Sequence, residues 1–146
     1  SNTVAEGYER VSEAIQKLLD EMNLTDDVFR IGLQYDIGSG GKRLSETQRQ
    51  KLHLARALLK NPDFLIVNQA LNSLSAREQS EIIDMCLEQA PSIEGEQPMG
   101  IVWAPTNPAF AMKFQRILIF QDRELKEDGS SQIIAENSEA YKELTS

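Results

Sequence analysis

Apolar residues in the first part of the chain recur three and four positions apart, which is the spacing of one face of an α-helix. They are Val4, Tyr8, Val11, Ile15, Leu18, Leu19 and Met22. The spacing predicts a long amphipathic helix from Val4 to Met22. A short second helix near Phe29 is expected to begin at Thr25, whose side-chain oxygen can accept from free backbone amides. A loop from Gly32 to Gly41 follows.

The next segment combines a helix start, a helix stop and a strand. Ser45 and Gln48 have the spacing of a capping box, in which each side chain accepts from a backbone amide of the other residue. The helix that begins there is expected to end near Lys60, because Pro62 cannot continue the backbone ladder. The run from Phe64 to Val67 is wholly apolar, which is typical of a buried strand.

Helices and strands are expected to alternate through the rest of the chain. Ser75 and Glu78 form a second capping-box pattern, which opens a helix to about Gln89. The further expected elements are a loop at 91–98, strands at Met99–Trp103 and Ile117–Phe120, a short helix capped by Asn107 between them, a hairpin partner at the sheet edge at Arg123–Lys126 and a final helix capped by Ser138. Such alternation predicts an α/β fold. We expect one domain, with a helical layer in residues 1–60 and a small, mostly parallel sheet flanked by helices in residues 61–146.

Composition limits the binding partners and the kinds of site that this chain is expected to have. The 146 residues carry a net charge of -8, so nucleic acid and anionic lipid are not expected as main partners. Cys86 is the only cysteine, which excludes an internal disulfide, and its spacing with neighbouring isoleucines indicates core packing. The only histidine, His53, is expected on a helix surface, and no metal site is predicted. No apolar run approaches the ~18–20 residues of a membrane span.

Residues 44–75 resemble the stretch of an ABC-transporter ATPase that runs from its signature to its D-loop. The matching scaffold letters are Leu44, Ser45, Gln48, Arg49, Gln50, Ala55, Arg56, Ala57, Leu58, Asn61 and Pro62. Residues 33–43 are similar to the exporter-type segment before the signature, and residues 116–120 and 129–135 resemble the closing strand and tail. The resemblance covers nearly the whole chain. It implies the carboxy-terminal part of a P-loop NTPase domain, in a longer protein at the cytoplasmic face of a membrane.

The residues that bind and hydrolyse ATP in that family are replaced here by other residue types. In the signature Leu44–Gln48, Glu46 and Thr47 occupy the two glycine positions. Asn68 and Gln69 stand for the Walker B aspartate and glutamate, Ser75 for the D-loop aspartate, and Pro105 and Thr106 for the neighbourhood of the family's histidine. Changes at so many places favour natural degeneration over laboratory substitution, for which replacing the glutamate alone would suffice. We therefore expect no catalytic residues.

A phosphate-binding loop is the second point on which the family pattern fails. GSGGK at Gly38–Lys42 is not a P-loop, because Asp36 holds the position of the first glycine and Arg43 replaces the magnesium-binding serine or threonine. The family's own phosphate-binding loop would precede Ser1. ATP and magnesium are thus expected only with an upstream half, and no cofactor is expected on this chain alone.

Three functional hypotheses follow from the resemblance. The first is a catalytically silent domain with a structural or regulatory role in a transporter, paired with a second ABC ATPase domain or with its own copy and joined to a transmembrane domain. The second is a subunit that still hydrolyses ATP through an intact upstream loop. The third is an interaction module without transport, built on the same scaffold. An uncovered strand edge at the place of the missing segment also predicts self-association.

Overall fold

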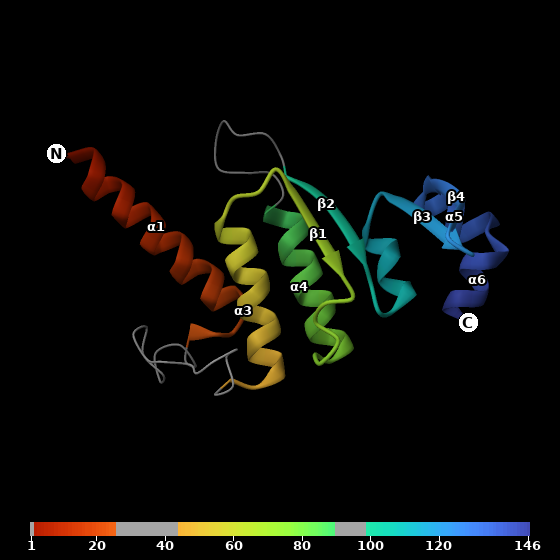
Figure 1. The fold of residues 1–146 in the computed structure, drawn as a ribbon, viewed down its shortest axis with the longest axis horizontal. Helices are drawn as coiled ribbons and strands as arrows, with labels where there is room; N and C mark the ends of the chain where they lie inside the picture. Colours follow the sequence, from red (N-terminus) through yellow and green to blue (C-terminus); the bar gives the residue numbers. More distant parts are fainter. Residues whose placement is uncertain (1, 26–43, 90–98) are drawn as a thin grey trace. The chain divides into compact units, whose positions relative to one another are not determined.

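The computed structural model describes residues 2–25, 44–89 and 99–146 (Figure 1). The expected short helix near Phe29, the loop at Gly32–Gly41 and the loop at 91–98 lie outside these residues. The elements are α1 (Asn2–Glu21), α3 (Glu46–Leu59), β1 (Phe64–Asn68), α4 (Ala76–Gln89), β2 (Gly100–Ala104), η2 (Pro108–Lys113), β3 (Arg116–Gln121), β4 (Glu124–Ser130), α5 (Ser131–Asn137) and α6 (Glu139–Thr145). None of the helices within these ranges is both long and apolar enough to cross a membrane.

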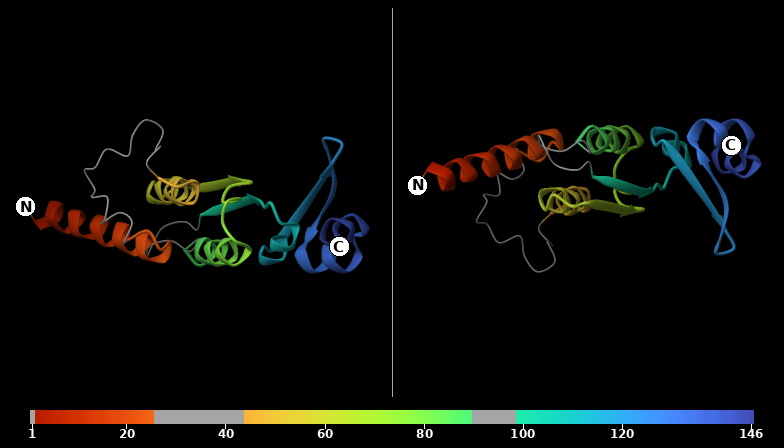
Figure 2. Two further views of the ribbon diagram at one scale, coloured as in Figure 1. Left: turned by 90° about the horizontal axis from the view of Figure 1, so that it is seen from below. Right: turned by 90° about the horizontal axis from the view of Figure 1, so that it is seen from above.

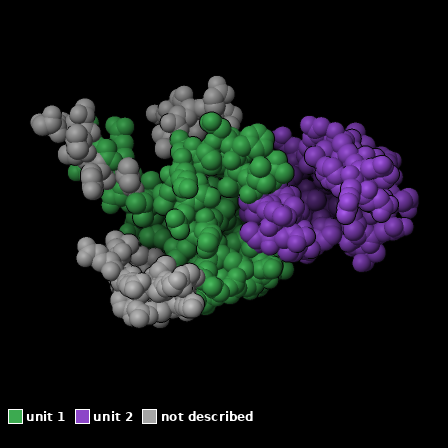
Figure 3. Space-filling view, in the orientation of Figure 1, with its two compact units in different colours: residues 1–66, 71–102 green, residues 67–70, 103–146 purple. Residues whose placement is uncertain are grey.

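The chain divides into two compact units, coloured separately in Figure 3. Unit 1 contains residues 1–66 and 71–102, and unit 2 contains residues 67–70 and 103–146. The boundary crosses β1 and β2, which are hydrogen-bonded to each other. Each unit has buried apolar side chains of its own.

Unit 1 is built on helices whose apolar faces are buried as the sequence predicts. The end of α1 buries Leu18, and Leu24 beyond it is also buried, whereas most described side chains earlier in the helix are exposed. In α3 the buried apolar residues are Leu54 and Ala55. In α4 they are Ile82, Ile83, Met85 and Cys86. The expected core position of Cys86 is confirmed, since its side chain is fully buried.

The β1 strand buries alternate side chains. Leu65 and Val67 are buried, whereas Phe64 and Ile66 are 61% and 73% exposed. At the start of β1 the carbonyl of Asp63 accepts from the amide of Gly100, 2.9 Å away. The β1 and β2 arrows point the same way in Figure 1. One face of this strand pair is therefore apolar and exposed.

Unit 2 is a hairpin with helices packed on it. The β3 and β4 strands pair antiparallel, and both views in Figure 2 show the hairpin running beside α5 and α6. Its two-residue turn is formed by Asp122 and Arg123, at φ 52° and 65°, the left-handed conformation that a hairpin turn of this length favours. Buried Ile117, Ile119, Ile134 and Tyr141 form its core.

The α/β class is observed, but the arrangement of strands differs from the expectation of a single sheet. Among the described residues there are two separate two-stranded sheets, β1 with β2 and β3 with β4. The strand expected near Ile117 therefore does not join the other two. Instead, the tight turn after Gln121 returns the chain at once, and β3 pairs antiparallel with β4.

Candidate functional site

The segment that resembles the ABC signature forms the start of α3. Ser45 is the N-cap, and its hydroxyl accepts from the amide of Gln48 at 3.1 Å, while the amide of Ser45 donates to Oε1 of Gln48 at 2.9 Å. The predicted capping box is thus confirmed. These two hydrogen bonds satisfy the backbone amides of Ser45 and Gln48, which have no acceptor within the helix at its first turn.

Glu46 is held on the first turn of α3. Its carboxylate forms an ion pair with Arg49 and accepts from Nε2 of Gln50 at 2.9 Å. Both charged side chains are partly exposed, at 55% for Glu46 and 37% for Arg49. A carboxylate suits the positive end of a helix, so Glu46 is favourable for α3 whatever it does to a ligand.

Thr47 and Gln50 connect α3 to the segment that resembles the D-loop. The hydroxyls of Thr47 and Ser73 lie 3.2 Å apart. Gln50 donates from Nε2 to Oδ1 of Asn72 at 2.8 Å, and its Oε1 accepts from the hydroxyl and the amide of Ser73 at 2.8 and 3.2 Å. Sequence reasoning placed Gln50 among the scaffold letters and missed this bridging role. The one local signal was its position four residues after Glu46.

Ser75, at the position of the D-loop aspartate, is a helix cap. Its amide and its hydroxyl both donate to Oε2 of Glu78, at 3.1 and 3.0 Å, and its hydroxyl accepts from the amide of Glu78 at 3.2 Å. These bonds lower the pKa of Glu78, the backbone amide of Ser75 first and its hydroxyl next, and the positive charge of Lys51 adds a smaller effect. The second predicted capping box is present.

Lys51 joins the two capped helices. Its side chain is only 10% exposed, and its Nζ lies 3.8 Å from Oε1 of Glu78. A lysine is rarely buried to this extent without a partner, and the Glu78 carboxylate supplies one. The signature-like and D-loop-like segments are therefore linked by Lys51 as well as by Gln50, all within unit 1.

Asn68 and Gln69, at the Walker B positions, end β1 and are both exposed. The chain leaves the strand through a left-handed backbone, with φ 48° at Gln69 and 67° at Leu71. The amide of Gln69 donates to the carbonyl of Ala104 at 2.9 Å, which places it next to Pro105. In unit 2 the structure thus brings together the residues that sequence reasoning assigned to the Walker B motif and to the family's histidine.

These positions offer neutral groups. A side-chain amide binds a divalent cation more weakly than a carboxylate does, and it cannot accept a proton at neutral pH. Within residues 2–25, 44–89 and 99–146, no three His, Cys, Asp or Glu side chains are grouped so that they could hold a metal ion. The GSGGK segment at Gly38–Lys42 lies outside the described residues.

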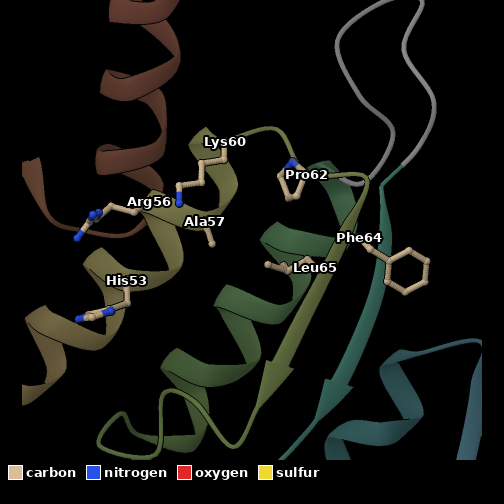
Figure 4. Close-up of a pocket in the computed structure, with 7 residues that line it drawn as sticks. All are labelled: His53, Arg56, Ala57, Lys60, Pro62, Phe64 and Leu65. Atoms are coloured by element: carbon tan, nitrogen blue, oxygen red, sulfur yellow. The ribbon is translucent and has the colours of Figure 1, made fainter.

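A hollow of about 370 Å³ lies at the other end of α3 (Figure 4). It is lined by His53, Arg56, Ala57, Lys60, Pro62, Phe64 and Leu65. In Figure 4 the side chain of Leu65 points toward α3, whereas the ring of Phe64 points away from it. His53, Arg56 and Lys60 are exposed, so the expectation of a helix-surface histidine is confirmed.

Comparison with known proteins identifies relatives among exporters. The chain is 38% identical over 76 residues to the ATP-dependent lipid A-core flippase of Xylella fastidiosa (strain Temecula1 / ATCC 700964), covering 51% of this chain and 13% of that protein. It is 34% identical over 114 residues to the ATP-dependent lipid A-core flippase of Pasteurella multocida (strain Pm70), covering 77% of this chain and 18% of that protein. No family model matches the chain.

The fold is shared with a solved exporter. A bacterial Atm1-family ABC exporter with ATP bound superposes with a TM-score of 0.73 at 22% sequence identity, covering 91% of this chain and 23% of the exporter chain. The chain spans less than a quarter of the length of each of these three proteins. The family resemblance predicted from the sequence is confirmed, and the chain belongs with the ABC exporters.

Proposed function

We propose that this chain is the carboxy-terminal part of an ABC-exporter nucleotide-binding domain that does not hydrolyse ATP. The observation that carries the proposal is the pair of amide side chains, Asn68 and Gln69, at the end of β1. The role left for such a domain is structural or regulatory. It would complete a dimer with a second ABC ATPase domain and pass motion to a transmembrane domain, at the cytoplasmic face of a membrane.

The loss of two carboxylates acts on two steps of hydrolysis. Magnesium is a hard cation that prefers charged oxygen ligands, so the neutral carbonyl oxygen of Asn68 would hold it weakly. An attacking water must give up a proton to a nearby base, and Gln69 has no basic oxygen at neutral pH. The side chains present at these positions therefore do not fit a magnesium-dependent hydrolytic site.

Glu46 and Thr47 support the same conclusion from the signature side. A like charge about 4 Å from a phosphate oxygen costs about 4 kcal/mol at an effective dielectric of 20, whereas the helix gains only about 0.3–1 kcal/mol from the carboxylate. The ion pair with Arg49 offsets part of this repulsion. The Thr47 side chain adds bulk where a glycine would let a ligand approach the backbone. The hydrogen bond between the hydroxyls of Thr47 and Ser73 holds this side chain in place.

Steady-state ATP hydrolysis by the natural protein that carries this chain tests the proposal. Gln69→Ala is compared with wild type, and Gln132→Ala on α5, an exposed glutamine outside the site, is the matched control. We expect all three proteins to have the same rate. A rate that falls on Gln69→Ala and not on Gln132→Ala would refute the proposal.

Binding to the 146-residue chain is a second test. Titration with ATP in the presence of magnesium, followed by calorimetry, is expected to give no heat of binding. Binding that requires magnesium and disappears in Asn68→Ala would contradict the proposal.

The names of the relatives favour one alternative. Two of them are ATP-dependent flippases, so a hydrolysing assembly in which an upstream phosphate-binding loop pairs with a partner's intact signature is the second candidate. The residues that precede Ser1 in the natural protein discriminate the two. A Gly-Lys-Ser or Gly-Lys-Thr loop there would favour nucleotide binding, and upstream sequence without membrane spans would favour an interaction module instead.

A further inference from the structure

Three basic side chains form a stripe along α3. His53, Arg56 and Lys60 are three and four residues apart, so they share one face of α3 and its C-terminal end, and all three are exposed. Two of them, Arg56 and Lys60, carry a full positive charge at neutral pH. We call this set the basic stripe, and it lines the hollow described above (Figure 4).

Within the described residues the basic stripe forms no ion pair, although the chain is rich in carboxylates. The chain has 23 acidic and 15 basic residues, and described ion pairs are formed by Lys17, Arg49, Lys51, Arg77, Arg116, Lys126 and Lys142. Arg56 and Lys60 are not among them.

A complementary stripe lies on α1. Glu6, Glu9 and Glu13 are also three and four residues apart, all are exposed, and within the described part of the chain none of them forms an ion pair. We call them the acidic stripe. The residues at the two ends of each stripe are seven positions apart, or roughly 10 Å at 1.5 Å per residue. The two stripes match in length and in spacing, and they are opposite in sign.

The two stripes do not meet within one molecule. Leu18, close to the C-terminal end of α1, is buried, and the turns that carry the acidic stripe stand clear of α3 in Figures 1 and 2. Because α1 and α3 belong to unit 1, this separation is a property of that unit. Within the described residues neither stripe has a partner of opposite charge, and a second molecule can supply one to each.

We propose that a second copy of this chain docks with its acidic stripe on the basic stripe, with the hollow beside α3 receiving the helix. A second copy is favoured over a membrane surface or a nucleic acid because it carries the acidic stripe at the matching spacing, whereas the net charge of -8 repels an extended polyanion. The charges of Arg56 and Lys60 would act on that stripe at contact range. The hollow adjoins the exposed apolar face of β1, because Phe64 lines it. The proposal does not depend on whether the domain hydrolyses ATP.

The test is a charge exchange, followed by sedimentation velocity of the 146-residue chain. Arg56→Glu with Lys60→Glu reverses the basic stripe, and Glu9→Lys with Glu13→Lys reverses the acidic stripe. Arg77→Glu with Lys126→Glu is the control for the first variant, since it makes the same change of net charge at exposed positions elsewhere. Circular dichroism checks that each variant keeps its helices.

We expect wild type and the control to self-associate at ~0.1 M salt and to dissociate at ~1 M salt, where the Debye length falls from ~10 to ~3 Å. Each stripe-reversed variant should associate at least about tenfold more weakly, and mixing the two variants should restore a complex. A variant with both stripes reversed should associate like wild type. The proposal is overturned if reversing the basic stripe leaves association unchanged, if wild type stays monomeric at low salt, or if the mixture forms no complex.

Discussion

Glu46 and Thr47 are predicted to stabilise α3, although the family resemblance assigns them to the two glycine positions of the signature. Both side chains are tied down, Glu46 to Arg49 and Gln50, and Thr47 to Ser73. Changing both to glycine, Glu46→Gly with Thr47→Gly, would restore the family's letters and remove all of these contacts. We expect the double variant to be less stable than wild type.

The magnitude follows from the contacts that are lost. An ion pair three residues apart on a helix contributes about 0.2–0.5 kcal/mol, and an exposed hydrogen bond such as that between Thr47 and Ser73 contributes about 0.5–1.5 kcal/mol. Glycine within a helix costs about 0.5–1 kcal/mol at each position. The free energy of unfolding should fall by about 2 kcal/mol. With a urea slope of about 1–3 kcal/mol/M for a small protein, the midpoint should fall by about 1 M.

Urea unfolding followed by circular dichroism in the far ultraviolet measures this change, since α3 is part of the helical signal. The control is Glu46→Gln with Thr47→Ser, which keeps an amide oxygen for Gln50 and a hydroxyl for Ser73. We expect the control to stay within about 0.5 kcal/mol of wild type. A glycine variant as stable as wild type would refute the reasoning, because it would mean that the contacts of Glu46 and Thr47 contribute nothing.

Three further predictions concern buried and capped side chains. Burial, reinforced by the charge of Glu21, raises the pKa of the Cys86 thiol to about 12. A thiol reagent at about pH 8 should therefore label Cys86 only after unfolding. Rapid labelling of the folded chain would contradict this prediction. Ile134→Ala should lower the free energy of unfolding by about 2–5 kcal/mol, because Ile134 is 6% exposed in the unit 2 core. The control Ile133→Ala should cost less than about 1 kcal/mol, because Ile133 is 58% exposed. Equal losses in urea unfolding would disprove the core assignment. The pKa of Glu78 is lowered in the folded state, so its stabilising effect is present above the ordinary glutamate pKa and is lost as the pH falls through the lowered value. Ser75→Ala should therefore cost about 0.5–2 kcal/mol at neutral pH and less in acid, and a cost that does not depend on pH would count against the cap.

Helix starts and the position of the first strand could be predicted because their signals are local, but the expectation that this strand is wholly buried is wrong for Phe64 and Ile66. The spacing of Ser45 with Gln48 and of Ser75 with Glu78 is enough to specify a capping box, and both are present. The apolar run around Leu65 predicted β1 in the same way. These patterns depend on residues that are neighbours in sequence, so no knowledge of the tertiary fold was needed.

The hairpin partner expected at Arg123–Lys126 is confirmed, but the full length of β4 and the helix after it were harder to predict. The β4 strand has the sequence ELKEDGS, in which most side chains are exposed, so neither alternation nor an apolar run marks it beyond Lys126. Its partner was fixed by the turn at Asp122 and Arg123, and left-handed backbone at an arginine has no sequence signal. The α5 helix begins at Ser131 directly after the strand, without a separating loop that would have indicated it.

The bridging role of Gln50 could not be predicted because it depends on tertiary contact. Its partners Asn72 and Ser73 lie 22 and 23 residues away along the chain. Only the packing of α3 near the start of α4 brings them within hydrogen-bonding distance. The assignment of Asn68 and Gln69 needed the family resemblance as well, since two exposed amides after a strand carry no signal of their own.

Burial explains how a scaffold can keep its packing while its reactive positions differ. Leu54 and Leu65 are 7% and 5% exposed, and truncating such side chains costs about 2–5 kcal/mol, so the fold itself restricts which residues can stand there. Asn68 and Gln69 are exposed, and the fold uses only the backbone of Gln69, through its bond to Ala104. Exchanging either amide for a carboxylate should therefore change stability by less than about 0.5 kcal/mol. In this fold the stability of β1 and the chemistry at its end are set by different residues, so one can be lost without the other.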